Sequence, residues 1–458
     1  MPEIISDNIS IVETNELERF SRIDAEYYHP KYLVLQKLYK RGNWSPIGCH
    51  LRTCEYGLSI AMNTEGKGYG ILRMDNLQGG FAFDDDLKYA PINEEVFDKY
   101  KLQKNDVLFN RVNSEEFVGR TGIYKLSGNH VFASYLVRCQ TKENELLPDY
   151  LNIFLNTEYG ILSIRRMSRR AVNQANVNAQ ELKAIKIPLP PLRFQEEIRN
   201  LLEKSHELFE KSKILYSQAE VLLLEELGLR DIDLFHEPSY AVNSADTITA
   251  NRIDAEYYQP KYDTLLSIIQ KKAKYCRQVR EFCSFNARGS QPIYSKEGNL
   301  RVINSKHIHE QHLDYENLER THEQNWNLQN EAKVSKYDIL TYTTGAYVGR
   351  TNIYFENDRA LASNHVNILR LREENPIYVC VVMNSMIGRL QTRKLVTGSA
   401  QVELYPDDID KFIIPFVDVR KQEQISNLIE ESYRARHEAK ALLEEAKKKV
   451  EEMIEKEV

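Results

Sequence analysis

One motif, Arg22-Ile23-Asp24-Ala25-Glu26-Tyr27-Tyr28-His29-Pro30-Lys31-Tyr32, occurs twice in this sequence. Its second copy covers residues 252–262, and ten of the eleven positions are identical, with Gln259 in place of His29. A second motif, Val118-Gly119-Arg120-Thr121, returns as Val348-Gly349-Arg350-Thr351, and both motifs recur at an offset of 230 residues. Because this offset is close to half of the 458 residues, the chain is a tandem repeat of one unit.

Each repeat ends in a predicted long helix whose apolar and small residues recur at alternating steps of three and four. The first seam includes Ile198, Leu202, Ser205, Phe209, Ser212, Tyr216, Ala219 and Leu223, and the second includes Ile425, Ile429, Ser432, Ala439, Ala446 and Val450. This 3.5-residue period is typical of a coiled coil, and small seam residues allow close approach. We predict that the two helices pair in an antiparallel coiled coil. The alternative is a pair of unrelated surface helices.

The residues before each helix form short β-type runs between clusters of Gly, Asn and Asp, followed by helical stretches at Asp149–Met167 and Ile377–Leu395. This pattern predicts an α+β fold with two pseudo-symmetric α/β domains separated by the two long helices. We predict a first domain at 1–188, a first spacer helix at 189–228, a linker and second domain at 229–415, and a second spacer helix at 416–458.

The composition is that of an ordinary globular protein, with 61 Lys and Arg against 67 Asp and Glu and a net charge of −6. The six cysteines form no C-x-x-C pair, which argues against a disulfide scaffold or a zinc ribbon. No apolar run approaches the roughly 18 residues of a membrane helix, and the first residues lack the features of a secretion signal. We therefore expect a cytoplasmic protein without membrane contact.

Sequence motifs for catalysis are not found. The chain contains no phosphate-binding G-x-x-x-x-G-K-[ST] run, no dinucleotide-binding glycine pattern, and no Asn-Pro-Pro-aromatic or Asp-Pro-Pro-aromatic run of an amino-methyltransferase. The one histidine cluster, His307, His309 and His312, has a spacing that fits no helical metal-ligand pair. We predict no catalytic residues and no metal site.

The order of these features closely resembles that of the specificity subunits of type I restriction–modification systems. The resemblance covers essentially the whole chain: the Arg22–Tyr32 motif, a variable α+β segment, Val-Gly-Arg-Thr, an Ile-Pro run and a long Gln-Glu-led helix, twice. It implies that each α+β segment is a target recognition domain reading one half of a bipartite DNA site, and that the helices form a spacer that docks methyltransferase subunits. Residues 49–90 and 276–322 occupy equivalent positions but differ in sequence, which suggests an asymmetric site. The alternative is neutral drift of exposed loops.

Basic side chains followed by amide side chains support a DNA-binding role in both repeats. Arg and Lys neutralise phosphates, while Asn and Gln bond adenine edges. The candidates in the first domain are Arg73, Asn76, Asn110, Arg111, Asn113, Arg165, Arg166, Arg169, Arg170, Gln174 and Asn176. Those in the second domain are Arg301, Asn304, Lys306, Thr343, Thr344, Arg389, Arg393, Lys394 and Gln401. Solvated helix faces are the alternative explanation for the charge clusters, and Arg120 and Arg350 fit a shared structural turn better than base reading.

The resemblance also implies partners: double-stranded DNA, two methyltransferase subunits and, in a complete host-defence complex, restriction subunits. It implies no cofactor on this chain, S-adenosylmethionine on the methyltransferase, and ATP and magnesium on the restriction translocase. Two alternatives stay open. One is a coiled-coil assembly scaffold that does not bind DNA, and the other is the specificity subunit of a related system with a fused methylase and nuclease.

Overall fold

The computed structural model describes residues 3–6, 8–12, 24–171, 174–398 and 401–456. The chain divides into two compact units, residues 1–209 with 436–458 and residues 210–435. Each unit therefore combines an α+β domain with a part of both long helices, α7 (Leu192–Glu226) and α15 (Val419–Lys456). The Arg22-Ile23 start of the first motif lies outside the described residues.

The first unit is built on a six-stranded sheet with the order β4-β13-β9-β11-β7-β6. Its strands are Leu51–Tyr56, Leu136–Thr141, Val107–Asn110, Thr121–Ile123, Phe81–Ala82 and Leu77–Gln78 in that order. A three-stranded sheet contains β12 (His130–Phe132), β5 (Tyr69–Leu72) and β8 (Lys88–Ala90). Two strand pairs join β16 (Lys186–Pro188) to β3 (Trp44–Pro46) and β1 (Glu3–Ser6) to β2 (Ile9–Ile11).

Short helices alternate with these strands along the first unit. They are α2 (Pro30–Leu38), α3 (Glu94–Tyr100), α4 (Pro148–Leu155), α5 (Glu158–Met167) and α6 (Ala179–Ala184), with short 3-10 turns η1 (Ile47–His50) and η2 (Met74–Asn76). The buried α4 contacts β9 and β11, so the sheet and this helix share one core.

The second unit repeats this topology. Its four-stranded sheet β18-β25-β22-β23 contains Cys283–Arg288, Val366–Leu371, Ile339–Tyr342 and Thr351–Ile353, in the same order as β4-β13-β9-β11. A second sheet, β20-β19-β24-β21, contains Glu319–Thr321, Leu300–Ile303, Ala360–Ala362 and Lys333–Val334. Strand β17 (Tyr275–Gln278) pairs with β26 (Ile413–Phe416), as β3 does with β16.

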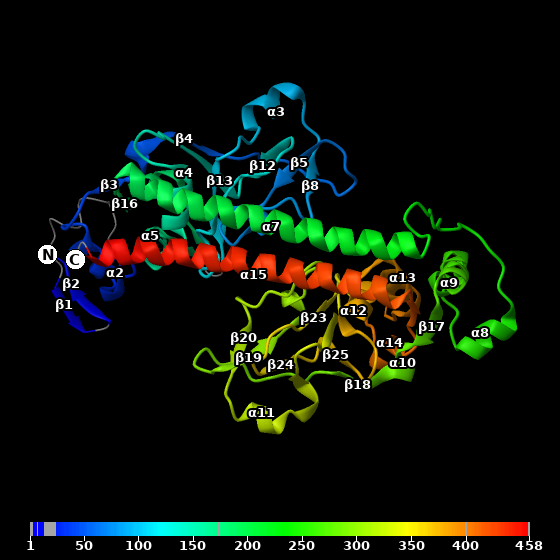
Figure 1. Ribbon diagram of the computed structural model, residues 1–458. Helices are drawn as coiled ribbons and strands as arrows, with labels where there is room; N and C mark the ends of the chain where they lie inside the picture. The colour runs from blue at the N-terminus through cyan, green and yellow to red at the C-terminus, as the bar shows by residue number, and fades with distance from the viewer. Residues whose placement is uncertain (1–2, 7, 13–23, 172–173, 399–400, 457–458) are drawn as a thin grey trace. The chain divides into compact units, whose positions relative to one another are not determined.

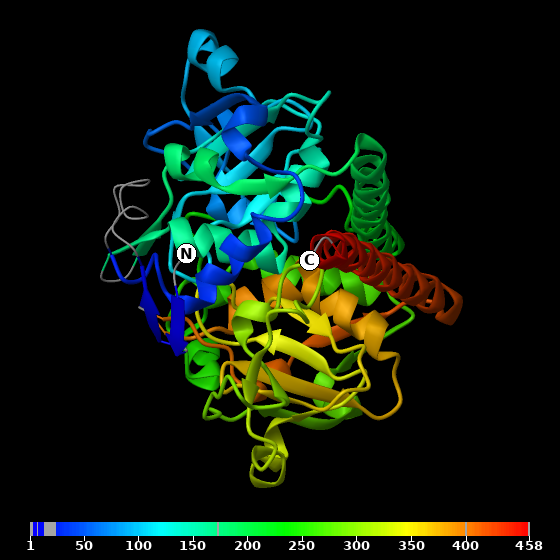
Figure 2. The same cartoon turned by 90° about the vertical axis from the view of Figure 1, so that its left-hand side faces the viewer.

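The remaining helices of the second unit are α8 (Ser244–Ala250), α9 (Pro260–Lys272), α10 (Val279–Phe282), α11 (Asn325–Leu328), α12 (Pro376–Asn384), α13 (Met386–Leu395) and α14 (Pro406–Ile409). Three 3-10 turns complete it: η3 (Glu256–Tyr258), η4 (Ser305–His307) and η5 (Asn330–Ala332). Figure 2 shows yellow strands of this unit beside orange helices, and α12 contacts β23. The predicted α+β fold with two pseudo-symmetric domains is confirmed.

The two long helices pack side by side in antiparallel fashion within each unit (Figure 1). In the first unit the Ser205 hydroxyl donates to the Ala439 carbonyl at 2.8 Å, and Arg436 lies over the Phe209 ring. In the second unit the Ser212 and Ser432 hydroxyls lie 3.0 Å apart. These contacts need small side chains, because a larger residue would separate the backbones. The predicted antiparallel coiled coil is confirmed.

The shared Val-Gly-Arg-Thr motif forms the same tight turn in both units. Gly119 and Gly349 have φ angles of 88° and 90°, a region that favours glycine. A Cβ atom would come within 2.5 Å of Ile164 at the first glycine and 2.7 Å of Thr392 at the second. Arg120 and Arg350 then stack on the aromatic rings of Phe117 and Tyr347, respectively, at 4.1 and 3.7 Å. This placement supports a structural role for the motif.

Candidate nucleic-acid interface

A small ladder next to the main sheet gathers several of the predicted residues of the first unit. Strands β14 (Arg169–Ala171) and β15 (Gln174–Asn176) form a hairpin, and β15 also pairs with β10 (Val112–Asn113). Arg169 and Gln174 are exposed on the hairpin, while Asn176 pairs with Val112. Arg170 takes part through its backbone, opposite Ala175. The ladder thus brings Arg169, Gln174 and Asn176 into one small sheet with Asn113, although these residues lie far from Asn113 in the sequence.

Arg111 organises this ladder from the end of β9. Its Nε donates to the Ser134 carbonyl at 3.1 Å, and one terminal nitrogen donates to the Asn176 amide oxygen at 3.3 Å. The guanidinium also lies 5.0 Å from the ring centroid of Tyr56, whose side chain is 42% exposed. Sequence reasoning missed Tyr56. Its position as the last residue of a strand, before Gly57, was the available signal.

The two adjacent arginines near the end of α5 have different surroundings. Arg166 is buried; its Nε donates to the Tyr27 carbonyl at 3.3 Å, and its guanidinium lies 4.4 Å from the Tyr27 ring centroid. Arg165 is partly exposed. Arg169, two residues beyond the helix, pairs with Glu181 at 2.6 Å while most of its side chain stays exposed.

Other predicted residues of the first domain have partners inside the domain. Asn76 is buried and accepts from the Arg73 backbone amide at 2.9 Å, and Arg73 pairs with Asp75 at 3.2 Å. Asn110 is fully buried and donates to the Phe117 carbonyl. Asn113 is partly buried, and its side-chain nitrogen lies 3.5 Å from the Met74 sulfur. This last contact joins η2 to β10.

The second unit forms an equivalent ladder from residues that face each other in single bridges. Glu403 pairs with both Thr344 and Thr397. In the first unit Asn176 pairs in the same way with Val112 and Arg169. Thr343 and Thr344 are buried, and the Thr343 carbonyl accepts from the Leu404 amide. Gln401 is exposed on the connecting loop. The same backbone arrangement therefore carries different side chains in the two units.

An arginine and a tyrosine also meet at the second ladder, and sequence reasoning missed both. Arg288 lies 4.6 Å from the ring centroid of Tyr405, which is 44% exposed, and donates to the Leu404 carbonyl. Arg288 ends β18 as Tyr56 ends β4, so the second unit has a cation at the strand end where the first unit has a ring. Glu403 lies 3.7 Å from Arg288.

The other predicted residues of the second unit are spread over two regions. Near η4, Arg301 pairs with Asp358 at 3.1 Å, Asn304 accepts from the Tyr294 hydroxyl, and exposed Lys306 pairs with Glu319.

On α13, Arg389 pairs with Glu310, and Arg393 is exposed. Lys394 lies 3.5 Å from Asp263 and over the Tyr257 ring.

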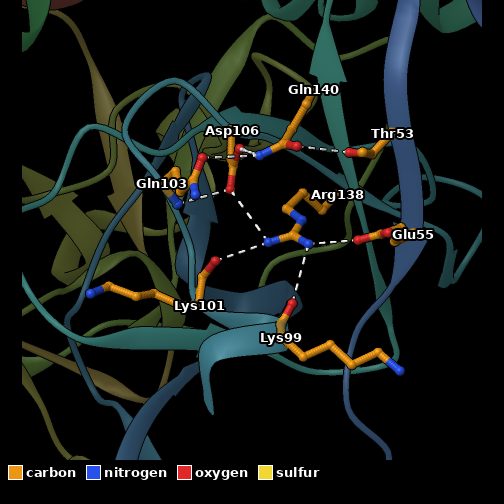
Figure 3. Close-up of polar contacts among 8 residues, drawn as sticks. All are labelled: Thr53, Glu55, Lys99, Lys101, Gln103, Asp106, Arg138 and Gln140. Atoms are coloured by element: carbon orange, nitrogen blue, oxygen red, sulfur yellow. Dashed lines mark hydrogen bonds and ion pairs between the residues drawn. The ribbon is translucent and has the colours of Figure 1, made fainter. Parts of the chain in front are cut away.

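A buried polar cluster in the first unit holds strands rather than facing a ligand (Figure 3). Arg138 donates to the Lys101 carbonyl at 2.9 Å and to the Glu55 carboxylate at 2.6 Å, and lies 3.9 Å from Asp106. Gln140 donates to Asp106 at 2.7 Å. Burial raises the pKa of the Asp106 carboxyl, although its hydrogen bonds and Arg138 oppose this shift. The second unit repeats the pair as Asp338 and Arg370 at 2.7 Å, which indicates that the pair stabilises the sheet.

The histidine cluster also has a structural explanation. His307 is buried, and its Nδ1 accepts from the Asn304 backbone amide at 2.9 Å, while the His309 and His312 rings stack 4.5 Å apart. Across the part of the chain that the structure describes, no group of three or more His, Cys, Asp or Glu side chains could hold a metal ion. The described helices also include none that is long and apolar enough to cross a membrane.

Residues 60–216 match the family model of the type I restriction modification DNA specificity domain. The chain is also 31% identical over 183 residues to the putative type I restriction enzyme MjaX specificity subunit of Methanocaldococcus jannaschii, covering 39% of this chain and 42% of the relative. Over part of its length the chain is therefore similar to type I specificity subunits.

A second similar protein is the specificity subunit of the type I restriction enzyme EcoKI from Escherichia coli, which is 29% identical over 180 residues, or 39% of this chain and 37% of the relative. The matches thus span less than half the length of these curated relatives. Among solved structures, the S subunit of a type I restriction–modification system from M. genitalium aligns over 91% of this chain and 96% of its own, with 12% identity and a TM-score of 0.40.

Proposed function

We propose that this chain is the non-catalytic DNA-recognition subunit of a type I restriction–modification complex and reads an asymmetric bipartite site. The observation that carries the proposal is the pair of ladders. In each unit the segment after α5 or α13 pairs with residues just beyond a central strand, β9 or β22. The backbone pairing is the same in both units, while the polar side chains differ. Two domains of one fold with different polar surfaces suit two half-sites of different sequence.

The proposed partners are those of the type I systems that this chain resembles. We propose that two methyltransferase subunits bind this chain and use S-adenosylmethionine, and that restriction subunits, where present, use ATP and magnesium. The proposed specificity subunit needs no cofactor of its own, and its role is to hold DNA in register for the methyltransferase. Its contacts with phosphates would come from exposed cations such as Arg169 and Arg393.

The direct test is a gel shift of the full chain with its purified methyltransferase on a library of random duplexes. We expect selection of one discontinuous sequence, and no methyl transfer by the purified chain alone. Retention of all duplexes with equal affinity, or of none, would reject DNA recognition and favour an assembly scaffold. Methyl transfer by the chain alone would reject the non-catalytic role.

Arg169 provides a sharper test of the interface. Arg169→Ala should weaken binding to every duplex and reduce the slope of log affinity against log salt by about one. Arg434→Ala on α15 is the matched control, because the two side chains are 67% and 68% exposed and each pairs with a glutamate. Equal salt slopes for both variants would exclude Arg169 from the DNA contact.

A further inference from the structure

The repeated motif folds in the same way in both units, although the proposed function gives it no part in DNA contact. In each copy the backbone amide of the first tyrosine donates to the motif aspartate at 3.1 Å. The two adjacent tyrosine rings meet edge to face, with centroids 4.9 Å apart in the first copy and 4.8 Å in the second, at 77° and 76°. The residues concerned are Asp24, Tyr27 and Tyr28, and Asp254, Tyr257 and Tyr258.

The first tyrosine of each copy contacts the helix that precedes the ladder. In the first unit the Arg166 guanidinium lies 4.4 Å from the Tyr27 ring centroid. In the second unit the Lys394 ammonium lies 5.3 Å from the Tyr257 ring centroid. Arg166 and Lys394 are both the penultimate residue of their helices, α5 and α13. The same cation–ring contact therefore joins motif and helix end twice.

In the second unit the motif arginine strengthens this connection. Arg252 donates to the Leu395 carbonyl at 2.9 Å and to the Val396 carbonyl at 3.0 Å, and lies 4.6 Å from the Tyr257 ring centroid. A cation that binds the last carbonyls of a helix also interacts favourably with the negative end of the helix dipole. The next residue, Thr397, is the first of the ladder.

We propose that each copy of the motif positions the loop that follows α5 or α13 in its own domain, by fixing the helix end from which that loop starts. Tyr27, Tyr257 and Arg252 are positioning residues in this account, which rests on the proposed function of the loops. It explains why the motif is nearly identical in the two repeats while the ladders differ. The loops are free to change sequence, since their starting points are held by side chains outside them.

Hydrogen exchange tests the positioning without DNA. The Thr397 amide donates to the Glu403 carbonyl at 3.0 Å, and the Glu403 amide donates to the Thr397 carbonyl at 2.8 Å. The exchange rates of these two amides therefore report on the ladder. In the full chain, Arg252→Ala should speed their exchange about tenfold, corresponding to the loss of about 1.4 kcal/mol. Arg252→Lys keeps the charge but lacks the fork that reaches both carbonyls, and should not restore protection. Unchanged exchange in Arg252→Ala would overturn the proposal.

Binding of the complex with its methyltransferase tests the consequence for specificity. Tyr257→Leu should reduce discrimination against single-base changes about tenfold in one half-site and leave the other half-site unchanged. Tyr27→Leu should affect the opposite half-site, and Tyr257→Phe, which keeps the ring, should behave like wild type. Equal loss in both half-sites, or equal loss in the Leu and Phe variants, would contradict positioning by the ring. If the wild-type complex discriminates between no duplexes, the proposed function fails, and hydrogen exchange alone decides the positioning.

Discussion

Asn76 and His307 hold equivalent 3-10 turns in the two units with different chemical groups. The Asn76 amide oxygen accepts from the Arg73 backbone amide at 2.9 Å, and the His307 Nδ1 accepts from the Asn304 backbone amide at 2.9 Å. Only the histidine can lose this acceptor by protonation. Burial lowers the pKa of His307 to about 4, with a smaller contribution from Lys306.

This difference predicts a pH dependence of stability for the second unit. Because the folded-state pKa is below the ordinary value of about 6.5, the stabilisation is present above pH 6.5 and is lost as pH falls towards 4. Wild type should lose about 2 kcal/mol more than His307→Asn between pH 7 and pH 5. Urea unfolding at the two pH values measures the difference, and parallel losses in both proteins would show that His307 is not the responsible group.

The candidate site was predictable from the sequence only in part, and the reason lies at this scale. Asparagine and threonine after a β-run offer the same donors and acceptors to a base edge as to a backbone turn. Asn76, Asn110 and Thr343 are buried, and the backbone contacts of Asn76 and Asn110 show the second use. Tyr56 gave only a weak signal, because a tyrosine at the end of a β-run is equally suited to a core, and Tyr405 gave none.

At the scale of elements, the order of strands and the two long helices could be predicted because periodicity and repetition report them directly. The predicted helical stretch Asp149–Met167 is instead two helices, α4 and α5. The first helix ends at Leu155, and Thr157 caps the start of the second by accepting from the Gly160 amide at 3.1 Å. Ser385 does the same between α12 and α13, accepting from the Ile387 amide. An N-cap inside an apolar stretch is a weak sequence signal.

The duplicated ion pairs make a prediction about the sheets. Arg138 is nearly buried beside buried Asp106, while the Arg370 side chain is 39% exposed beside buried Asp338. Arg138→Met and Arg370→Met should each cost about 3 kcal/mol, since both leave a buried carboxylate without its cation. Adding Asp106→Asn to Arg138→Met should recover part of the loss. Urea unfolding gives these values, and a cost below about 1 kcal/mol for either arginine would refute the role assigned to the buried carboxylates.

At the scale of the whole molecule, duplication is the feature that organises the chain. The two units share strand order, the Val-Gly-Arg-Thr turn, the buried Asp–Arg pair and the tyrosine motif. They differ at the ladders, where Asn176 of one unit corresponds to Glu403 of the other. A scaffold that is kept and a polar surface that changes are expected of two domains that read different bases.

The measurement that tests this account most directly is the set of methylated positions in DNA from cells that express the chain with its methyltransferase. We expect one discontinuous target, made of two different half-sites separated by unspecified bases. Its adenines should lose methylation when the chain is omitted. A continuous palindromic target, or methylation that does not depend on this chain, would contradict the claim that the two units each read one half-site.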